Sequence, residues 1–330
     1  MNLAKIAKKL GVSRWTVSRA LYSSGYVDKK KKEKILTYLK KIDYTPNIHA
    51  SSLGGKRSRV IGLILPKGVV SGFDFFLAET IKHLALGLKN SGYSLMLFID
   101  KEGDDAGIAK LWENRTIAGA VMFSSTKDDV GKLRELIKCR MPSVLVFSHF
   151  KGIDSFACDN EYGGYLATKY LIEKGRRRIA FIHGNPAWVD SADRFKGYLR
   201  ALAEHGIVCD SVLVKEGYFN VPEGKKAAEK LIGLEKRPDA IFASNDNMAI
   251  GAAWAIGEKQ LRIPGDIAVI GFDNNADAKN TNPPLTTIAQ PIKEIIDASM
   301  ERLIAKIEGR ETGKPVLRLF PPKLIERGSV

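Results

Sequence analysis

The sequence predicts a small all-α head followed by a bilobed α/β core built from two doubly wound parallel-sheet subdomains. Charge supports this division, because residues 1–59 hold fifteen Lys and Arg against three acidic residues, while the rest of the chain is nearly balanced. The apolar pattern changes as well, from helical spacing to short apolar runs that begin at Val60. We therefore expect a head over residues 1–45, a linker over 46–59 and a core over 60–330.

Length and composition exclude several classes of protein. With 330 residues, 45% of them hydrophobic, the chain can bury a sizeable core. No apolar run approaches the roughly 18 residues that span a bilayer, and charges occupy the N-terminus where a signal peptide is apolar, so we expect a cytoplasmic protein. The cysteines and histidines lack the spacing of metal or redox motifs, so no metal and no cofactor are expected.

The charge of the head predicts an anionic partner. Residues 1–59 carry a net charge of +12. A simple solvated face is the alternative, but this excess repels itself within a compact fold unless an anion neutralises it. We interpret the head as a nucleic-acid-binding module.

Three short helices are predicted in the head. The first places apolar residues at helical spacing from Leu3 to Leu10. Gly11 permits a tight turn, and Ser13 can cap a second helix that begins at Arg14, which makes a helix-turn-helix. The third helix opens after Asp28. Its expected buried residues are Ile35, Leu36, Leu39 and Ile42.

The second helix separates apolar from polar residues. At about 100° per residue, Val17 and Ala20 share one side, whereas Trp15 and Arg19 lie on the other. In a major groove, arginine can bond guanine O6 and N7, and the edge of Trp15 can pack on a thymine methyl group. The alternative for Trp15 is packing against a neighbouring element.

Several strings resemble one family of regulators. NLAKIAKKLGVSRWTVSRALYSSGYVDKKKKEKIL, then YTPN and SSLGG, resembles the DNA-binding head of lactose-repressor/galactose-repressor (LacI/GalR-type) transcription regulators. The likeness continues in DNEYGGYLATKYLIEKGRRRIAFIHG, DRFKG, SNDNMAIGA, IPGDIAVIGFDN and PPLTTIAQP. It implies a periplasmic-binding-protein-like core. The DNA contacts it implies in the head are Ser13, Arg14, Trp15, Thr16, Ser18, Arg19 and Tyr26. Tyr22 and Lys5 depart from the family's usual asparagine and acid.

The linker can form a short helix. Asn47 can cap the stretch IHASSL, which ends at Gly54 and Gly55, and about two turns of helix are marginal alone. The resemblance implies a hinge helix that orders on operator DNA, where Leu53 enters a minor-groove base step. Asn47 and Ala50 complete the expected DNA contacts. Packing of Leu53 on the core is the alternative.

Apolar runs predict the strands of the core. They are VIGLIL (60–65), YSLMLFI (93–99), GAVMFS (119–124), SVLVFS (143–148), RIAFIH (178–183), SVLVKE (211–216), AIFAS (240–244) and IAVIGF (267–272), with a shorter strand FAC (156–158). Apolar runs that alternate with helices indicate parallel sheets covered on both faces. No GxGxxG or GxxxxGK[ST] string occurs, so nucleotide-phosphate chemistry is not expected.

Polar residues follow the strands at the end where open parallel sheets bind ligands. They are Asp159 after FAC, Arg194 at the start of the helix after RIAFIH, Asn245 after AIFAS and Asp273 after IAVIGF. Their paired hydrogen bonds suit the adjacent hydroxyls of a sugar, although helix caps and salt bridges between lobes are the alternatives. The resemblance implies the same four residues as effector contacts.

Aromatic residues near the same edge could stack on a sugar ring. They are Phe76, Trp188 and Phe219, and the resemblance implies a stacking role for Phe219. Phe75 is the alternative to Phe76. Asp246 is expected to orient its neighbours.

We expect a homodimeric transcription repressor controlled by a small-molecule effector, most simply a sugar. A two-fold dimer binds a pseudo-palindromic double-stranded operator, and the effector must favour one arrangement of the core. The alternatives are a purine-type corepressor, a catabolite regulator that needs a phosphocarrier protein, and a sugar-processing enzyme. The enzyme is disfavoured because the sequence assembles no nucleophile, base and orienting group. A transport-binding protein would share the core fold, but it would need export, for which the sequence shows no signal.

Overall fold

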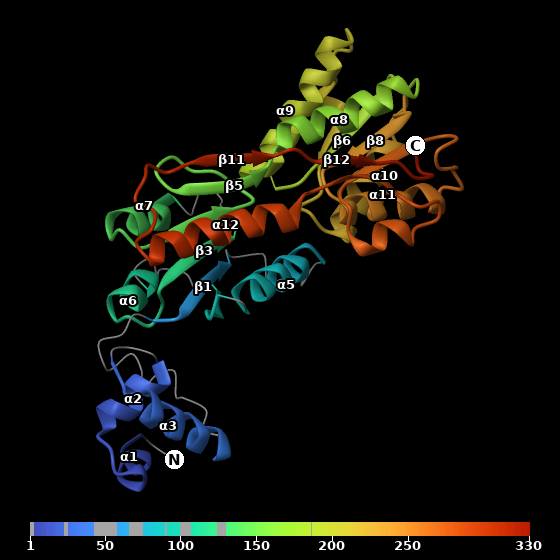
Figure 1. The fold of residues 1–330 in the computed structure, drawn as a ribbon. Helices are drawn as coiled ribbons and strands as arrows, with labels where there is room; N and C mark the ends of the chain where they lie inside the picture. The colour runs from blue at the N-terminus through green and yellow to red at the C-terminus, as the bar shows by residue number, and fades with distance from the viewer. Residues whose placement is uncertain are drawn as a thin grey trace. The chain divides into compact units, whose positions relative to one another are not determined.

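The structure is a computed structural model of the 330-residue chain. It describes residues 3–22, 26–42, 58–65, 75–89, 91–99, 107–123, 130–185 and 187–330. The chain divides into two compact units, Met1–Arg57 and Ser58–Val330 (Figure 1). Among the described residues, no helix is long and apolar enough to cross a membrane.

The first unit contains the predicted helices. They are α1 (Leu3–Leu10), α2 (Arg14–Tyr22) and α3 (Lys29–Lys41). Gly11 adopts a φ of 65° in the turn between α1 and α2, a conformation that costs glycine little. Ser13 caps α2 by accepting a hydrogen bond from the Thr16 N–H at 3.0 Å, and Asp28 caps α3 through the Lys31 N–H at 3.1 Å.

A small apolar core joins the three helices of the first unit. Its buried residues are Ile6, Ala7, Val17, Ala20, Ile35 and Leu39. The prediction that Leu36 is buried was wrong, because this side chain is 41% exposed. Leu36 lies about 100° around the helix from Ile35, and α3 buries only a narrow stripe through Ile35 and Leu39.

The second unit is built on two sheets, one in each lobe. In the first lobe the strand order is β11-β5-β4-β3-β1-β2, and all neighbours are parallel. In the second lobe the order is β12-β10-β9-β8-β6-β7, with only β12 antiparallel to its neighbour. The first-lobe strands are β1 (Val60–Leu65), β2 (Ser94–Ile99), β3 (Gly119–Phe123), β4 (Ser143–Val146), β5 (Asp154–Cys158) and β11 (Leu317–Phe320). The second-lobe strands are β6 (Ile179–His183), β7 (Val214–Glu216), β8 (Ala240–Ala243), β9 (Ala268–Asp273), β10 (Thr286–Ala289) and β12 (Lys323–Ile325).

Helices cover both faces of each sheet. In the first lobe, α5 (Phe75–Lys89) and α12 (Ile292–Ile307) pack on one face, and α6 (Gly107–Glu113) and α7 (Val130–Lys138) on the other. In the second lobe, α8 (Asn160–Glu173) and α9 (Val189–Glu204) lie opposite α10 (Val221–Ile232) and α11 (Asp246–Glu258) (Figure 1). Successive strand residues point to opposite faces of the sheet. Phe181 packs with α8 and α9, whereas Ile182 packs with α10 and α11. This confirms two doubly wound subdomains.

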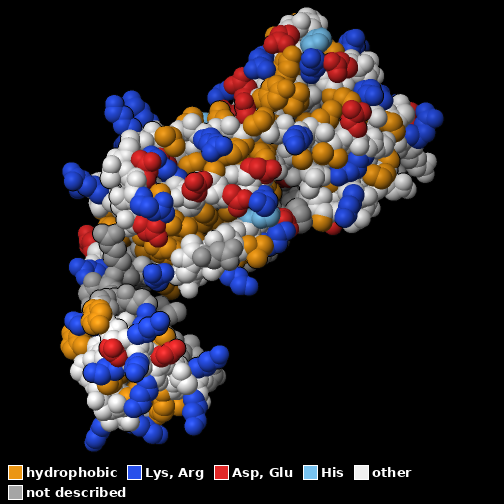
Figure 2. Space-filling model, in the orientation of Figure 1, with side chains coloured by type: hydrophobic (Ala, Val, Ile, Leu, Met, Phe, Trp, Pro, Cys, Tyr) orange, Lys and Arg blue, Asp and Glu red, His pale blue; other side chains and the backbone are white. Residues whose placement is uncertain are grey.

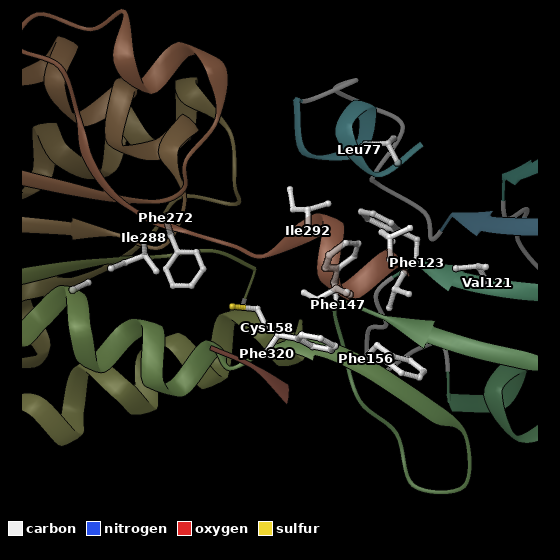
Figure 3. Packing of buried hydrophobic residues seen from close by; sticks show 14 of the residues in the cluster. Leu77, Val121, Phe123, Phe147, Phe156, Cys158, Phe272, Ile288, Ile292 and Phe320 are labelled. Atoms are coloured by element: carbon white, nitrogen blue, oxygen red, sulfur yellow. The ribbon is translucent and has the colours of Figure 1, made fainter. Parts of the chain in front are cut away.

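The chain passes between the lobes after β5, after β10 and after β11. At these connections Cys158, Ile292 and Phe320 belong to one buried apolar cluster. Figure 3 shows this cluster running from Phe272 in the second lobe, past Cys158 and Phe320, to Phe147 in the first. Apolar packing therefore joins the lobes along the same segments that connect them covalently.

Some strand predictions needed correction. Of SVLVKE, only Val214–Glu216 is a strand, because Asp210 accepts a hydrogen bond from the Val212 N–H and holds Ser211–Leu213 in a 3-10 turn. The strand FAC extends back to Asp154. The strands β10, β11 and β12 were not predicted. In β11, Arg318 separates Leu317 from Leu319 and all three side chains are exposed, so the strand contains no continuous apolar run.

Candidate functional site

One side of α2 presents the residues predicted to read DNA. The Trp15 side chain is 71% exposed, whereas Val17 and Ala20 on the opposite side are buried. Arg14 and Arg19 are exposed as well. The alternative that Trp15 packs against a neighbouring element does not describe this head, because little of its ring is covered.

Hydroxyl groups lie at the start of α2, along this helix and just before α3. Ser13 Oγ lies 2.9 Å from Thr16 Oγ1, in addition to capping the helix. Ser18 and Thr16 are half-buried, and Tyr26 is 90% exposed just before α3. Hydroxyls and backbone amides at a helix N-terminus are typical phosphate contacts, so this edge suits the DNA backbone.

Basic side chains gather over the head, as Figure 2 shows. Lys29, Lys30, Lys31 and Lys32 form the first turn of α3, where the helix dipole is itself positive. Cations at that end of a helix are unfavourable, and the capping carboxylate of Asp28 is one negative charge against four lysines. This placement supports a role for the lysines in binding phosphate.

The predicted contacts of the linker lie outside the described residues. They are Asn47, Ala50 and Leu53.

Arg194 is the centre of the polar residues between the sheets. It lies in the second turn of α9, not at its start as predicted, because α9 begins at Val189. Its side chain is 3% exposed. Nε donates to Asn160 Oδ1 at 2.8 Å and Nη1 donates to the Ser244 carbonyl, while the guanidinium lies 3.8 Å from the centre of the Phe272 ring. One side chain therefore joins the ends of β5, β8 and β9.

Two carboxylates flank this guanidinium. Asp190 Oδ2 is 3.6 Å from Arg194 Nη2, and Asp273 Oδ1 is 3.7 Å from Nη1. Gln290 also donates to Asp273 Oδ1, at 2.7 Å. Burial raises the pKa of Asp190, and the attraction of Arg194 only partly opposes this shift. Two carboxyl groups therefore share one guanidinium.

Asp159 and Asn245 act as helix caps. Asp159 Oδ1 accepts from the Tyr162 N–H at 2.9 Å, and Asn245 Oδ1 accepts from the Met248 N–H at 2.9 Å. Asn245 Nδ2 also donates to the Phe219 carbonyl at 3.1 Å. The caps hold both side chains at the carboxyl ends of β5 and β8, the edge at which Arg194 lies.

Two of the predicted aromatic residues lie together and the third does not. The ring centroids of Trp188 and Phe219 are 5.8 Å apart. Phe219 has a φ of 62°, and its ring leaves no room for a side chain at Gly184, where a Cβ would come within 2.1 Å of it. Phe76 instead packs edge-on against Phe147, with centroids 4.7 Å apart. The side chain of Phe75 is outside the described residues.

Several residues of the Arg194 cluster were not predicted from the sequence. Asp190 could have been found, because it precedes Arg194 by one helical turn. Asn160, Ser244 and Gln290 carry no local signal, since tertiary packing alone brings them to Arg194. Ser244 Oγ is also buried without a hydrogen-bond partner among the described residues, and a ligand can satisfy such a group.

Asp246 accepts two hydrogen bonds from residues near the same edge of the sheet. Oδ1 accepts from the Thr287 hydroxyl at 2.6 Å and Oδ2 from the Asn275 N–H at 2.7 Å. Burial raises the pKa of Asp246 well above its ordinary value. The carboxyl group orients its neighbours, as predicted.

Comparison with known proteins assigns the family. Residues 2–47 match bacterial regulatory proteins of the lacI family, and residues 168–330 match a periplasmic binding protein-like domain. The HTH-type transcriptional repressor PurR of Vibrio atlanticus (strain LGP32) is 33% identical over 338 residues, covering 100% of this chain and 98% of the relative.

Solved structures agree with this assignment over the whole length. A lac repressor dimer bound to operator and the anti-inducer ONPF is 25% identical, with a TM-score of 0.87, covering 100% of this chain and 98% of that one. A complex of the transcriptional regulator CelR with cellobiose is 27% identical, with a TM-score of 0.77 and full coverage of both chains. The relatives are regulators and not enzymes. The chain belongs to the lacI family of bacterial regulatory proteins and is a DNA-binding transcription regulator with a periplasmic-binding-protein-like effector core.

Proposed function

We propose that the protein is a homodimeric repressor whose operator binding is controlled by a sugar held beside Arg194. The arrangement of Arg194 between Asp190 and Asp273 carries this proposal. Carboxylates accept hydrogen bonds from hydroxyl groups, and a rigid guanidinium can donate to a pair of adjacent oxygens. The rings of Trp188 and Phe219 can cover the apolar face of a sugar.

Similar proteins support the proposal. One solved relative is a complex of a regulator with cellobiose, another is a repressor dimer on its operator, and PurR is a repressor by name. Two heads related by two-fold symmetry would bind a pseudo-palindromic operator, with α2 of each head in a major groove. Arg14, Trp15 and Arg19 are the proposed base contacts. The proposed phosphate and minor-groove contacts are Ser13, Thr16, Ser18, Tyr26, Asn47, Ala50 and Leu53.

Effector control would act through the connections between the lobes. A ligand at Arg194 contacts residues that follow β5, β8 and β9, close to where the chain crosses after β5 and β10. A ligand that binds one arrangement of the lobes more tightly shifts the population toward it. The same differential affinity sets how strongly operator binding changes.

A thermal-shift screen of the full-length protein tests the effector class. We expect mono- or disaccharides to raise the melting temperature, and the same sugars to change operator affinity measured by fluorescence anisotropy. Stabilisation by nucleobases alone would overturn the sugar assignment in favour of a purine corepressor. An operator affinity that changes only after a phosphocarrier protein is added would favour catabolite regulation.

Replacement of Arg194 by lysine tests the centre of the site. We expect Arg194→Lys to weaken sugar binding at least tenfold, because one ammonium group cannot reproduce the contacts of the guanidinium. Operator affinity without sugar should stay the same. The matched control is Arg262→Lys, since the Arg262 side chain is 79% exposed and pairs with Asp266 on the surface. An Arg194→Lys protein that no longer folds would make Arg194 a structural residue.

A further inference from the structure

A groove opens from the Arg194 cluster along the side of the core. Its lining includes Asn160 and Asp190, both of which contact Arg194, so it is continuous with the proposed effector site. Its volume is about 460 Å³. The groove runs between β11 on one side and the helices α8 and α9 on the other, and the two sides differ in chemistry.

The β11 side is mostly apolar, although Ser148 and His149 also line the groove after β4. Leu317 and Leu319 line it together with Ala157 and Phe147. Alternate residues of a strand point the same way, so Leu317 and Leu319 form one surface, and they are 55% and 48% exposed. Large apolar side chains that remain exposed beside a hollow mark a surface that a ligand can cover.

The helical side is polar but its cations are already paired. Lys196 Nζ lies 2.6 Å from Asp193 Oδ1, and Arg200 Nη1 donates to Glu161 Oε1 at 3.1 Å. Asp159 and Asp190 add further carboxylates. Among the described residues that line the groove, every lysine and arginine therefore has a carboxylate partner. Hydroxyl groups find donors and acceptors here, whereas a phosphate group meets an excess of negative charge.

We propose that the effector is an uncharged disaccharide that occupies the whole groove, with one ring at the end beside Asp190 and Arg194 and the second ring along Leu317 and Leu319. This inference rests on the proposed function, because it specifies the size and charge of the sugar. A sugar ring has an apolar face and a rim of hydroxyls, which match the leucine side and the helical side. A wholly apolar group would leave the polar side without hydrogen bonds.

The volume of the groove supports the size of this ligand. Pockets that bury drug-sized molecules measure about 300–1,000 Å³, and the groove at about 460 Å³ falls within that range. A disaccharide, at about two dozen non-hydrogen atoms, is a molecule of this size, whereas a single sugar ring has about half as many. A monosaccharide beside Arg194 would leave the leucine surface uncovered.

Isothermal titration of the full-length protein with paired sugars tests the proposal. The probes are cellobiose, maltose, lactose, sucrose and trehalose, with glucose, galactose, fructose and glucose 6-phosphate. We expect at least one disaccharide to bind at least tenfold more tightly than its constituent monosaccharides and than the phosphorylated sugar. Leu319→Asp should remove most of this advantage, while the affinity for monosaccharides stays the same.

Val316→Asp is the matched control. Val316 is 42% exposed, precedes β11 directly and does not line the groove, so this variant should bind the disaccharide like the unmodified protein. Monosaccharides that bind as tightly as the disaccharides, or equal losses in both variants, would overturn the groove proposal and leave a sugar effector standing. Tighter binding of glucose 6-phosphate would overturn the assigned charge. Failure of every saccharide to bind would overturn the proposed function together with this inference.

Discussion

At the scale of single residues, side chains of the same type differ in their burial and in their partners. Arg194 and Arg262 are both paired with aspartate, but Arg194 is buried between two carboxylates and Arg262 is exposed to water. Trp15 and Trp188 are both aromatic residues near a helix N-terminus, yet Trp15 stands exposed on the head and Trp188 packs against Phe219. Burial and partners decide which of them can recognise DNA or a small ligand.

Trp15→Ala should change the operator preference of the protein without changing its stability. The exposed ring contributes little to the core, so we expect the free energy of unfolding to stay within about 0.5 kcal/mol of the original. Loss of one base contact should cost about 1–3 kcal/mol at a single base-pair position. Binding to a library of operator variants measures this preference. Leu36→Ala, another exposed apolar residue of the head, is the control, and identical profiles for both variants would contradict direct readout by Trp15.

Asp190→Asn should stabilise the protein at neutral pH. Burial raises the pKa of Asp190 in the folded state, so this carboxyl group loses its proton more easily in the unfolded chain. The free energy of unfolding therefore falls as pH rises above about 4. The advantage of the variant should therefore be absent at lower pH and grow toward pH 7. Urea unfolding at several pH values measures it.

Asp266→Asn provides a comparison of opposite sign. Hydrogen bonds from Arg262 lower the pKa of Asp266, so its ionised form stabilises the fold. The variant should lose stability at pH 7, and this loss should shrink as pH falls below about 4. A parallel pH dependence in both variants would contradict the electrostatic explanation of Asp190.

At the scale of elements, two close helix pairs shape the second lobe. Gly164 of α8 faces the backbone of Arg194 in α9, and Gly251 of α11 faces the backbone of Val221 and Lys225 in α10. Absence of a Cβ at these positions lets the helices approach closely. The approach of α8 to α9 also sets where Arg194 lies relative to Asn160.

Gly164→Ala should separate α8 from α9 and weaken effector binding. A Cβ at this position would lie 2.1 Å from the Arg194 carbonyl oxygen, so the helices must move, at a cost of about 1–3 kcal/mol in stability. Gly257→Ala is the matched control, because nothing lies within 4 Å of a Cβ there. That variant should be neutral or gain up to about 1 kcal/mol, since alanine favours a helix. Thermal unfolding and sugar titration compare the two, and equal stability in both would contradict the packing argument.

At the scale of the whole molecule, charge divides the functions between the two units. The basic residues of the head create an electrostatic attraction to DNA, whereas the core holds a nearly balanced surface and an acidic crevice. Each unit also has its own apolar core. The two recognition tasks can therefore be altered separately.

Lys29→Gln combined with Lys30→Gln should reduce the salt dependence of operator binding. Each phosphate contact releases counterions, so loss of two contacts should lower the slope of log K against log salt by about 1.8. Anisotropy titrations at several salt concentrations measure the slope. Lys236→Gln, an exposed change in the core, should leave it unchanged. An unchanged slope in the double variant would show that the lysines of α3 do not contact phosphate.

Most of the fold could be predicted because its signals are local. Helical spacing and caps define α2 and α3 through Ser13 and Asp28, and apolar runs such as VIGLIL define the central strands. Strand β11 was not predicted, because its exposed Leu317 and Leu319 form no apolar run and the strand depends on pairing with β5. No local feature of the sequence distinguished Phe75 from Phe76 as the candidate stacking residue.

The sequence by itself determined the division of charge, the helix-turn-helix with an outward-facing Trp15, and the two parallel sheets with polar residues at their carboxyl ends. Only the tertiary structure decided that Asn160, Ser244 and Asp273 meet at Arg194, and that the leucines of β11 face α9 across a groove. Periodicity and capping depend on neighbours along the chain, and these are visible in a sequence. Contacts among residues 30 to 160 positions apart depend on how the lobes close on their shared core, which no local pattern encodes.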